Sequence, residues 1–212
     1  MGKVILMKSI RGTVECEWII RKSRFLGFLT PVLTSEEATA FLGHCREAHP
    51  DATHVCHALR LSSQETVERA SDDGEPQKTA GFPMLELLKK KGLTDVLAVT
   101  VRYFGGIKLG AGGLVRTYAE TLRLCLEKAE PVEAIGFVEG WIKVPYTAFG
   151  PLESFLRQVT RQIDVRFEED AEIRFVCQES DVTVIAGEIK KRTSSDLEVE
   201  IVRRWIDYPK SK

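Results

Sequence analysis

Five glycines and one lysine stand within nine residues, GGIKLGAGG, between an apolar segment and an amphipathic one. Glycine at this density permits backbone conformations that a Cβ would forbid, or lets another group approach the main chain closely. Where such a loop leads into a helix, free N–H groups and the positive end of the helix dipole favour an anion. The segment therefore predicts either an anion-binding loop or a tight strand-to-helix turn. Its glycines are Gly105, Gly106, Gly110, Gly112 and Gly113.

The loop differs from the two common nucleotide-binding loops. A P-loop continues with Gly-Lys-Ser/Thr, whereas Gly110 is followed by Ala111 and Gly112. The dinucleotide fingerprint needs a third glycine where Val115 stands. The glycine pattern thus predicts an anion or a tight turn without indicating a nucleotide.

Two stretches of opposite charge accompany this loop. Residues 99–119 contain three bases and no acid, namely Arg102, Lys108 and Arg116. Residues 64–76 contain five carboxylates and one arginine, and Asp72, Asp73 and Glu75 are three of these acids. The three acids could form a divalent-metal or general acid/base site. Alternatively, they form a solvated acidic turn, or they pair with Arg102 or Lys108 and accept backbone N–H bonds. The opposite charges favour this bracing role if the two loops meet.

The histidines lie close together in the sequence but do not predict a metal site. All four stand between residues 44 and 57: His44, His49, His54 and His57. Five residues on a helix separate the first two by about 140°, and three residues on a strand place the last two on opposite faces. No zinc-finger spacing is present either.

Composition limits the classes of protein that fit. A chain of 212 residues can form one or two domains with a sizeable core. Its net charge of −1 gives no general affinity for polyanions, so a nucleic-acid surface must be a local patch. Five cysteines without a CxxC pair predict reduced thiols in the cytoplasm. We see neither a signal peptide nor an apolar run of membrane length, and so expect a cytoplasmic protein with no membrane partner.

Hydrophobic periodicity predicts an α+β fold for the first half of the chain. Thr34 and Glu37 have the capping-box spacing that begins a helix. The segment after the glycine loop places Leu114, Val115 and Tyr118 on one helical face. We expect strands at 14–20, 25–32, 54–61 and 96–101, helices at 35–49, 79–91 and 114–126, and a loop at 65–76.

The second half predicts a separate domain of the ferredoxin-like, split βαβ kind. After a linker at 131–136, the pattern reads strand, helix, two strands, helix and strand. Ser180 is the expected cap of the last helix, and residues 197–201 the expected final strand. We therefore place one domain at 1–134 and another at 135–212. The second shows no catalytic constellation and no evident aromatic pattern of an RNA-recognition motif.

Two motifs resemble the signatures of the YigZ/IMPACT family. They are SDDGEPQKTAGFPML at 71–85 and VRYFGGIKLGAGGLVRTY at 101–118, while KSRF and DATHVCHA fall where that family has similar segments. Gln77-Lys78 and His57 depart from its usual pattern. The resemblance implies a first domain like domain IV of elongation factor G and a second like its domain V. It also implies a link to translational control, no firm enzymatic activity and no cofactor.

Two functions follow as hypotheses. The one we favour is a module that binds RNA or the ribosome and regulates translation, with no catalytic residue and no metal ligand. Its predicted phosphate- or nucleic-acid-binding residues are Arg102, Gly105, Gly106, Lys108, Gly110, Gly112, Gly113 and Arg116, with Arg102 orienting the acidic loop. The alternative is a metal-assisted enzyme acting on a phosphorylated small molecule or nucleotide, in which Asp72 and Asp73 hold Mg²⁺ or act as base.

Overall fold

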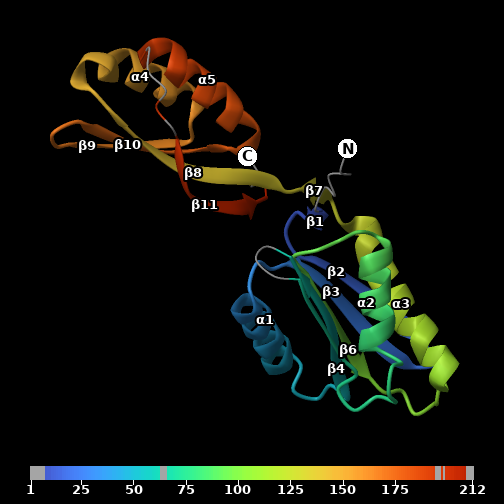
Figure 1. The fold of residues 1–212 in the computed structure, drawn as a ribbon. Helices are drawn as coiled ribbons and strands as arrows, with labels where there is room; N and C mark the ends of the chain where they lie inside the picture. Colours follow the sequence, from blue (N-terminus) through green and yellow to red (C-terminus); the bar gives the residue numbers. More distant parts are fainter. Residues whose placement is uncertain (1–7, 63–65, 194–196, 198, 209–212) are drawn as a thin grey trace. The chain divides into compact units, whose positions relative to one another are not determined.

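The computed structural model describes residues 8–62, 66–193, 197 and 199–208 of the chain. The fold is α+β, as predicted. The chain divides into two compact units, of which the first ends at Ala134 and the second runs from Ile135 to Tyr208. Each unit is described by itself (Figure 1).

The first unit is built on a five-stranded antiparallel sheet. Two helices, α2 (Gly81–Lys90) and α3 (Ala111–Lys128), cover one face, and α1 (Ser35–Ala48) lies on the other (Figure 1). Thr34 begins α1 as predicted, because its hydroxyl accepts the N–H of Glu37 at 3.2 Å. In spatial order the strands are β2 (Val14–Ile20), β3 (Ser23–Pro31), β6 (Val96–Tyr103), β4 (His54–Leu61) and β5 (Val67–Ser71).

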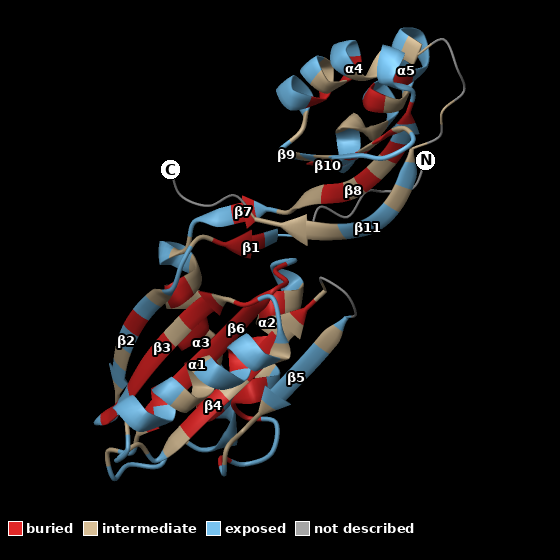
Figure 2. Ribbon diagram, turned by 90° about the vertical axis from the view of Figure 1, so that its left-hand side faces the viewer, coloured by how far each residue is buried: buried red, intermediate tan, exposed pale blue. Residues whose placement is uncertain are grey.

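The central strand β6 is buried on both faces, which explains its unbroken run of apolar residues. Val96 and Ala98 pack in the core under α2 and α3, whereas Leu97 and Val99 pack in the core under α1. Figure 2 shows buried residues concentrated on the inner strands β3, β6 and β4. The sheet is thus a rigid middle layer that fixes where its connecting loops emerge.

The structure corrects several predicted boundaries. The expected loop at 65–76 contains β5, an edge strand paired with β4. The expected linker at 131–136 contains β7 (Pro131–Glu133), which pairs with β1 (Lys8–Ile10). Strands this short, with few apolar residues, leave no alternation to detect. Val115, expected to face the core, is 37% exposed.

The β1–β7 pair is attached to the sheet through β1. The N–H of Thr94, just before β6, donates to the carbonyl of Lys8 at 2.8 Å. The hydroxyl of Ser9 donates to the carbonyl of Asp95 at 3.0 Å. These bonds hold the start of the described chain against the entry to the central strand.

The second unit has the predicted split βαβ order. Its helices α4 (Tyr146–Val159) and α5 (Val182–Thr193) cover a four-stranded sheet (Figure 1). In spatial order the strands are β11 (Glu200–Asp207), β8 (Ile135–Val144), β10 (Ala171–Gln178) and β9 (Gln162–Phe167). Ser180 does not cap α5, because it lies in a 3₁₀ turn, η1 (Glu179–Asp181), before that helix. The last strand begins at Glu200, later than predicted.

No helix in the described part of the chain combines the length and apolarity needed to cross a membrane.

Candidate nucleic-acid-binding surface

Three connections of the first unit emerge at one end of its sheet. At the end of β6, Tyr103 lies opposite Arg24, next to the β2–β3 turn, and Arg102 lies opposite His54 at the start of β4. β5 ends at Ser71, close to that same point. The β2–β3 turn, the acidic loop and the glycine loop are therefore neighbours (Figure 1). We call residues 21–22, 72–80 and 104–110 the loop end.

Asp72 caps helix α2. Its Oδ1 atom accepts the N–H groups of Ala80 and Gly81, each at 2.9 Å. Its Oδ2 atom accepts the N–H of Lys78 at 2.6 Å. A carboxylate is favourable here because it satisfies orphan amides and faces the positive end of the helix dipole. Both oxygens of Asp72 are thus engaged in holding the loop on the helix.

Asp73 ties the acidic loop to the other side of the sheet. Its Oδ2 atom accepts the N–H of Val55 at 2.7 Å, and its Oδ1 atom accepts from Arg46 of α1 at 2.9 Å. Its carbonyl oxygen lies 2.7 Å from Nδ1 of His54. Asp73 therefore connects the loop to β4 and α1.

Glu75 lies inside the first unit. Its Oε1 atom accepts from Nη1 of Arg102 at 2.5 Å and from the hydroxyl of Tyr118 at 2.7 Å. Its Oε2 atom lies 3.9 Å from Nε2 of His54. Burial first, and then the adjacent Cys56 and Glu75, raise the pKa of Tyr118 far above its ordinary value, so this hydroxyl keeps its proton. It donates to Glu75 and accepts from Sγ of Cys56 at 3.4 Å.

The acidic loop thus braces the fold. Each of its three predicted acids has protein partners for its oxygens. Across residues 8–62, 66–193, 197 and 199–208, no group of three His, Cys, Asp or Glu side chains could hold a metal ion. The arrangement supplies position and rigidity to the loop end.

The glycine loop packs against the β2–β3 turn. A Cβ at Gly105 would collide with the backbone of Lys22, and the Gly105 N–H donates to Ser23 Oγ at 3.1 Å. Gly106 and Gly110 have φ angles of +85° and +74°, which side-chain-bearing residues rarely adopt. These three glycines therefore shape the loop.

The remaining predicted residues divide into an exposed group and a buried one. Gly112 and Gly113 lie in the first turn of α3, whose cap, Gly110, provides no side-chain hydrogen bond. Lys108 and Arg116 are exposed. Arg102 is not, because only 6% of its side chain is accessible and its guanidinium lies between Glu75 and the ring of Phe25. Arg102 is therefore a bracing residue and does not belong to an exposed phosphate-binding set.

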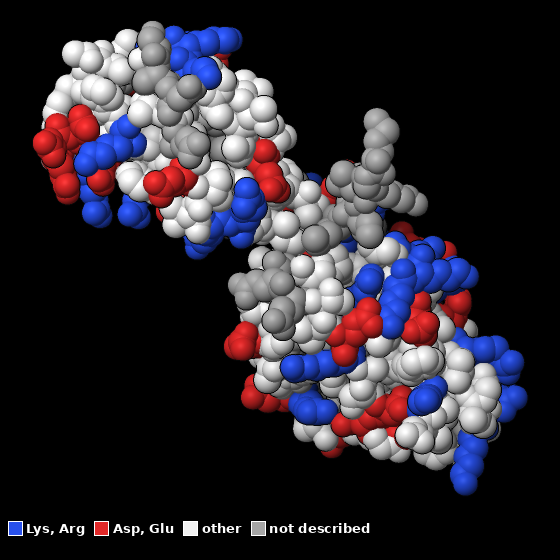
Figure 3. Space-filling model, in the orientation of Figure 1, with Lys and Arg blue, Asp and Glu red and all other residues white. Residues whose placement is uncertain are grey.

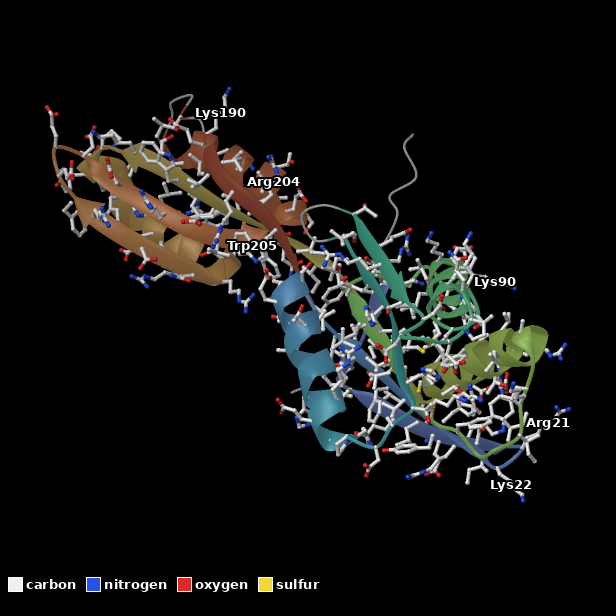
Figure 4. All side chains as sticks on the ribbon, turned by 90° about the horizontal axis from the view of Figure 1, so that it is seen from below. Arg21, Lys22, Lys90, Lys190, Arg204 and Trp205 are labelled. Atoms are coloured by element: carbon white, nitrogen blue, oxygen red, sulfur yellow. The ribbon has the colours of Figure 1, made fainter. Side chains whose placement is uncertain are left out.

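Three further cations gather at the loop end that the sequence did not indicate. Arg21 and Lys22 form the β2–β3 turn, and Nη1 of Arg21 donates to the carbonyl of Lys108 at 3.4 Å (Figure 4). Lys78 belongs to the acidic loop and is exposed. With Lys108 and Arg116 they make five exposed cations for which the described residues supply no carboxylate partner. Figure 3 shows Lys and Arg side chains at the lower right edge of the first unit, where α3 begins.

Apolar side chains are exposed among these cations. Phe82 is 44%, Phe104 45% and Ile107 42% exposed. The Arg102 guanidinium lies 5.3 Å from the centre of the Phe104 ring, and Nζ of Lys78 lies 5.8 Å from that of Phe82. Positive charge and open aromatic rings together can contact both phosphates and bases.

Comparison with known proteins identifies the family. The Impact N-terminal domain matches residues 21–126. The Bacillus subtilis IMPACT family member YvyE is 35% identical over 91% of this chain and 89% of its own length. The Escherichia coli member YigZ is 37% identical over 68% of this chain and 72% of its own. A crystal structure described as a hypothetical protein is 29% identical, covers 93% of this chain and 97% of its own, and has a TM-score of 0.71. The chain thus belongs to the IMPACT family.

Proposed function

We propose that this protein binds RNA through the loop end of its first unit and acts on the ribosome in the regulation of translation. The observation that carries the proposal is the presence, at the loop end and the start of α3, of five exposed cations to which the described residues give no carboxylate partner, on a chain whose net charge is −1. They come from three separate turns and the start of α3. A local patch of this kind is what a phosphate backbone requires.

The same surface has features suited to phosphates and unpaired bases. Phosphates would meet Lys108, Arg116 and the first amides of α3, where the helix dipole favours an anion. Phe82 and Phe104 offer rings on which bases can stack without sequence readout. We therefore expect binding that is salt-dependent and weakly specific.

The open sheet face of the second unit is a poorer candidate. Cross-strand neighbours there alternate in sign, so that Glu172 lies between Lys143 and Arg166. On the same face Arg203 pairs with Glu139 at 3.3 Å. Alternating charges cancel, and such a face has little attraction for a polyanion.

The ribosomal part of the proposal rests on the family resemblance, which links this family to translational control and to domains of elongation factor G. A metal-assisted enzyme is not proposed, because Asp72, Asp73 and Glu75 use their oxygens within the fold. A metal ion or substrate at these oxygens would have to break hydrogen bonds that hold α2, β4 and α3 in place.

Co-sedimentation with purified ribosomes and separated subunits, at low and high salt, tests the proposal. We expect wild-type protein to pellet at low salt only, and Lys108→Glu/Arg116→Glu to remain in the supernatant. The matched control is Lys90→Glu/Lys91→Glu, which makes the same charge change at the C-terminal end of α2, opposite the end that Asp72 caps (Figure 4). Failure of the wild type to pellet, or equal loss in both double variants, would contradict the proposal.

A further inference from the structure

Two cysteines far apart in the sequence meet inside the first unit. Cys16 on β2 and Cys125 on α3 have their sulfur atoms 2.7 Å apart. Only 7% of Cys16 and none of Cys125 is exposed. A disulfide bond is about 2.05 Å long, so the two sulfurs need to approach by only about 0.7 Å to form one.

Gly27 makes the space in which the two sulfurs meet. It lies directly opposite Cys16 in the β2–β3 register. A Cβ at this position would stand 2.7 Å from the sulfur of Cys16 and 2.9 Å from that of Cys125. Any residue other than glycine would therefore push the pair apart, so the absence of a side chain here is tied to the thiol pair.

The two thiols differ in access and in acidity. Cys16 stands on the edge strand β2 and is 7% exposed, whereas Cys125 of α3 is fully buried. The hydrogen bond with Cys125 lowers the pKa of Cys16, and Lys128 adds to this effect. The same hydrogen bond and burial raise the pKa of Cys125. Cys16 is thus the less buried thiol and the one that ionises more readily.

We propose that Cys16 and Cys125 are a site of reversible oxidation, at which hydrogen peroxide joins β2 to α3 through a disulfide. The Cys16 thiolate attacks one peroxide oxygen, the O–O bond breaks, and hydroxide leaves. The sulfur of Cys125 then attacks that of Cys16, the S–O bond breaks, and a second hydroxide leaves. The two thiol protons convert the hydroxides to water, and the two electrons lost by the sulfurs have reduced the peroxide. Excess dithiothreitol reverses the bond by thiol–disulfide exchange.

The other described cysteines serve as internal controls. Burial raises the pKa of Cys45 to about 11, and Cys45 packs in the core under α1, on the opposite face of the sheet from the pair. Burial likewise raises the pKa of Cys56 to about 12 and that of Cys177 to about 11. Proximity and acidity together single out one pair.

Peptide mapping of the full wild-type chain tests this assignment. The folded protein is treated with hydrogen peroxide, its remaining thiols are alkylated in denaturant, and the digest is analysed without reduction. We expect a cross-linked peptide containing Cys16 and Cys125, which dithiothreitol abolishes, while Cys45, Cys56 and Cys177 are alkylated. Alkylation of Cys125 in protein whose Cys16 has been oxidised would overturn the proposal, as would a bond between Cys16 and Cys45.

Two variants and a melting curve give independent readouts. In Cys125→Ser, oxidation should stop at a sulfenic acid on Cys16 that a dione reagent traps, whereas Cys45→Ser should form the disulfide as the wild type does. Because the bond would close a long loop, oxidised wild type should melt several degrees above reduced wild type. Equal melting temperatures together with an unchanged peptide map would refute the proposal. The map of the wild type decides the question even if a variant folds poorly.

Discussion

Glu75 and Arg102 form an ion pair in the interior of the first unit, with 2.5 Å between Oε1 and Nη1 and only 3% and 6% of their side chains exposed. Tyr118 donates to the same carboxylate oxygen at 2.7 Å. One atom thereby connects the acidic loop, the central strand and helix α3. Since a buried pair often adds little net stability, its contribution here is to fix the position of the loop end.

Removing the charge of Glu75 should destabilise the protein. In Glu75→Gln, Arg102 stays buried without a counter-charge, so we expect the free energy of unfolding to fall by about 3 kcal/mol or more. Urea denaturation measures the change. Glu17→Gln, which breaks the exposed pair with Arg24, is the control and should leave stability unchanged. A loss below about 1 kcal/mol for Glu75→Gln would show that the pair is not needed.

Asp72→Ala should lower the free energy of unfolding by about 2 kcal/mol, because three backbone N–H groups lose their acceptor and α2 loses its cap. Asp72→Asn should cost less, since its single oxygen can still accept from Ala80 and Gly81. Thermal and urea unfolding of both variants check this order. If Asp72→Ala were as stable as wild type, the capping role would be wrong.

Two glycines of the same loop should respond in opposite ways to alanine. Gly105→Ala places a methyl group against the backbone of Lys22, so we expect a loss of about 2 kcal/mol. Gly112→Ala meets no atom within 4 Å in the first turn of α3, so stability should be unchanged or rise by up to about 1 kcal/mol. Each variant is the control for the other in the same unfolding assay. Equal effects would show that the close approach to Lys22 does not constrain the loop.

His57 should make the protein less stable in mild acid. No residue in the described part of the chain hydrogen-bonds its buried Nδ1, and burial, with the charge of Arg46, lowers its pKa below the ordinary 6.5. Below pH 6.5, His57 therefore binds a proton in the unfolded chain but stays neutral in the folded chain. The free energy of unfolding falls as the pH drops through that range. Above pH 6.5, His57 is neutral in both the folded and the unfolded state, so it does not make the free energy of unfolding depend on pH.

The variant His57→Phe isolates this effect. Its free energy of unfolding relative to wild type should grow as the pH is lowered from 7 to 5 and stay constant above 7. Urea titrations across this range measure it. His44→Gln, at an exposed position on α1, is the control and should follow the wild-type curve. A constant difference between His57→Phe and wild type at all pH values would contradict the prediction.

Elements with a buried face could be predicted from the sequence, because the residues on that face are apolar and recur at a regular spacing. Strand β6 shows this as an unbroken apolar run and α3 as residues three and four apart. Strand β5, with the sequence VERAS, could not be predicted in this way, because it is an edge strand held mainly by backbone pairing to β4. The opposite charges of the two loops did favour contact between them, and Glu75 with Arg102 provides that contact.

The composition of the loop end was harder to foresee. Arg21 and Lys22 stand in a turn that only the antiparallel register brings next to the glycine loop. Nothing in the apolar periodicity marks Phe104 as exposed, because it directly follows a buried strand. The useful signal would have been topological: a hairpin turn and a loop between antiparallel neighbours must share one end of the sheet.

The β1–β7 pair has a mechanical consequence. Ala134 alone separates β7 from β8, so tension between the two units reaches the first unit through a three-residue ladder. Its partner β1 is in turn held by Lys8 and Ser9 to the entry of β6. A ladder this short breaks under less force than a five-stranded sheet does. We therefore expect β1 and β7 to separate first when the two units are pulled apart. A force applied to the second unit would separate β7 from β1 and would leave the geometry of the loop end unchanged.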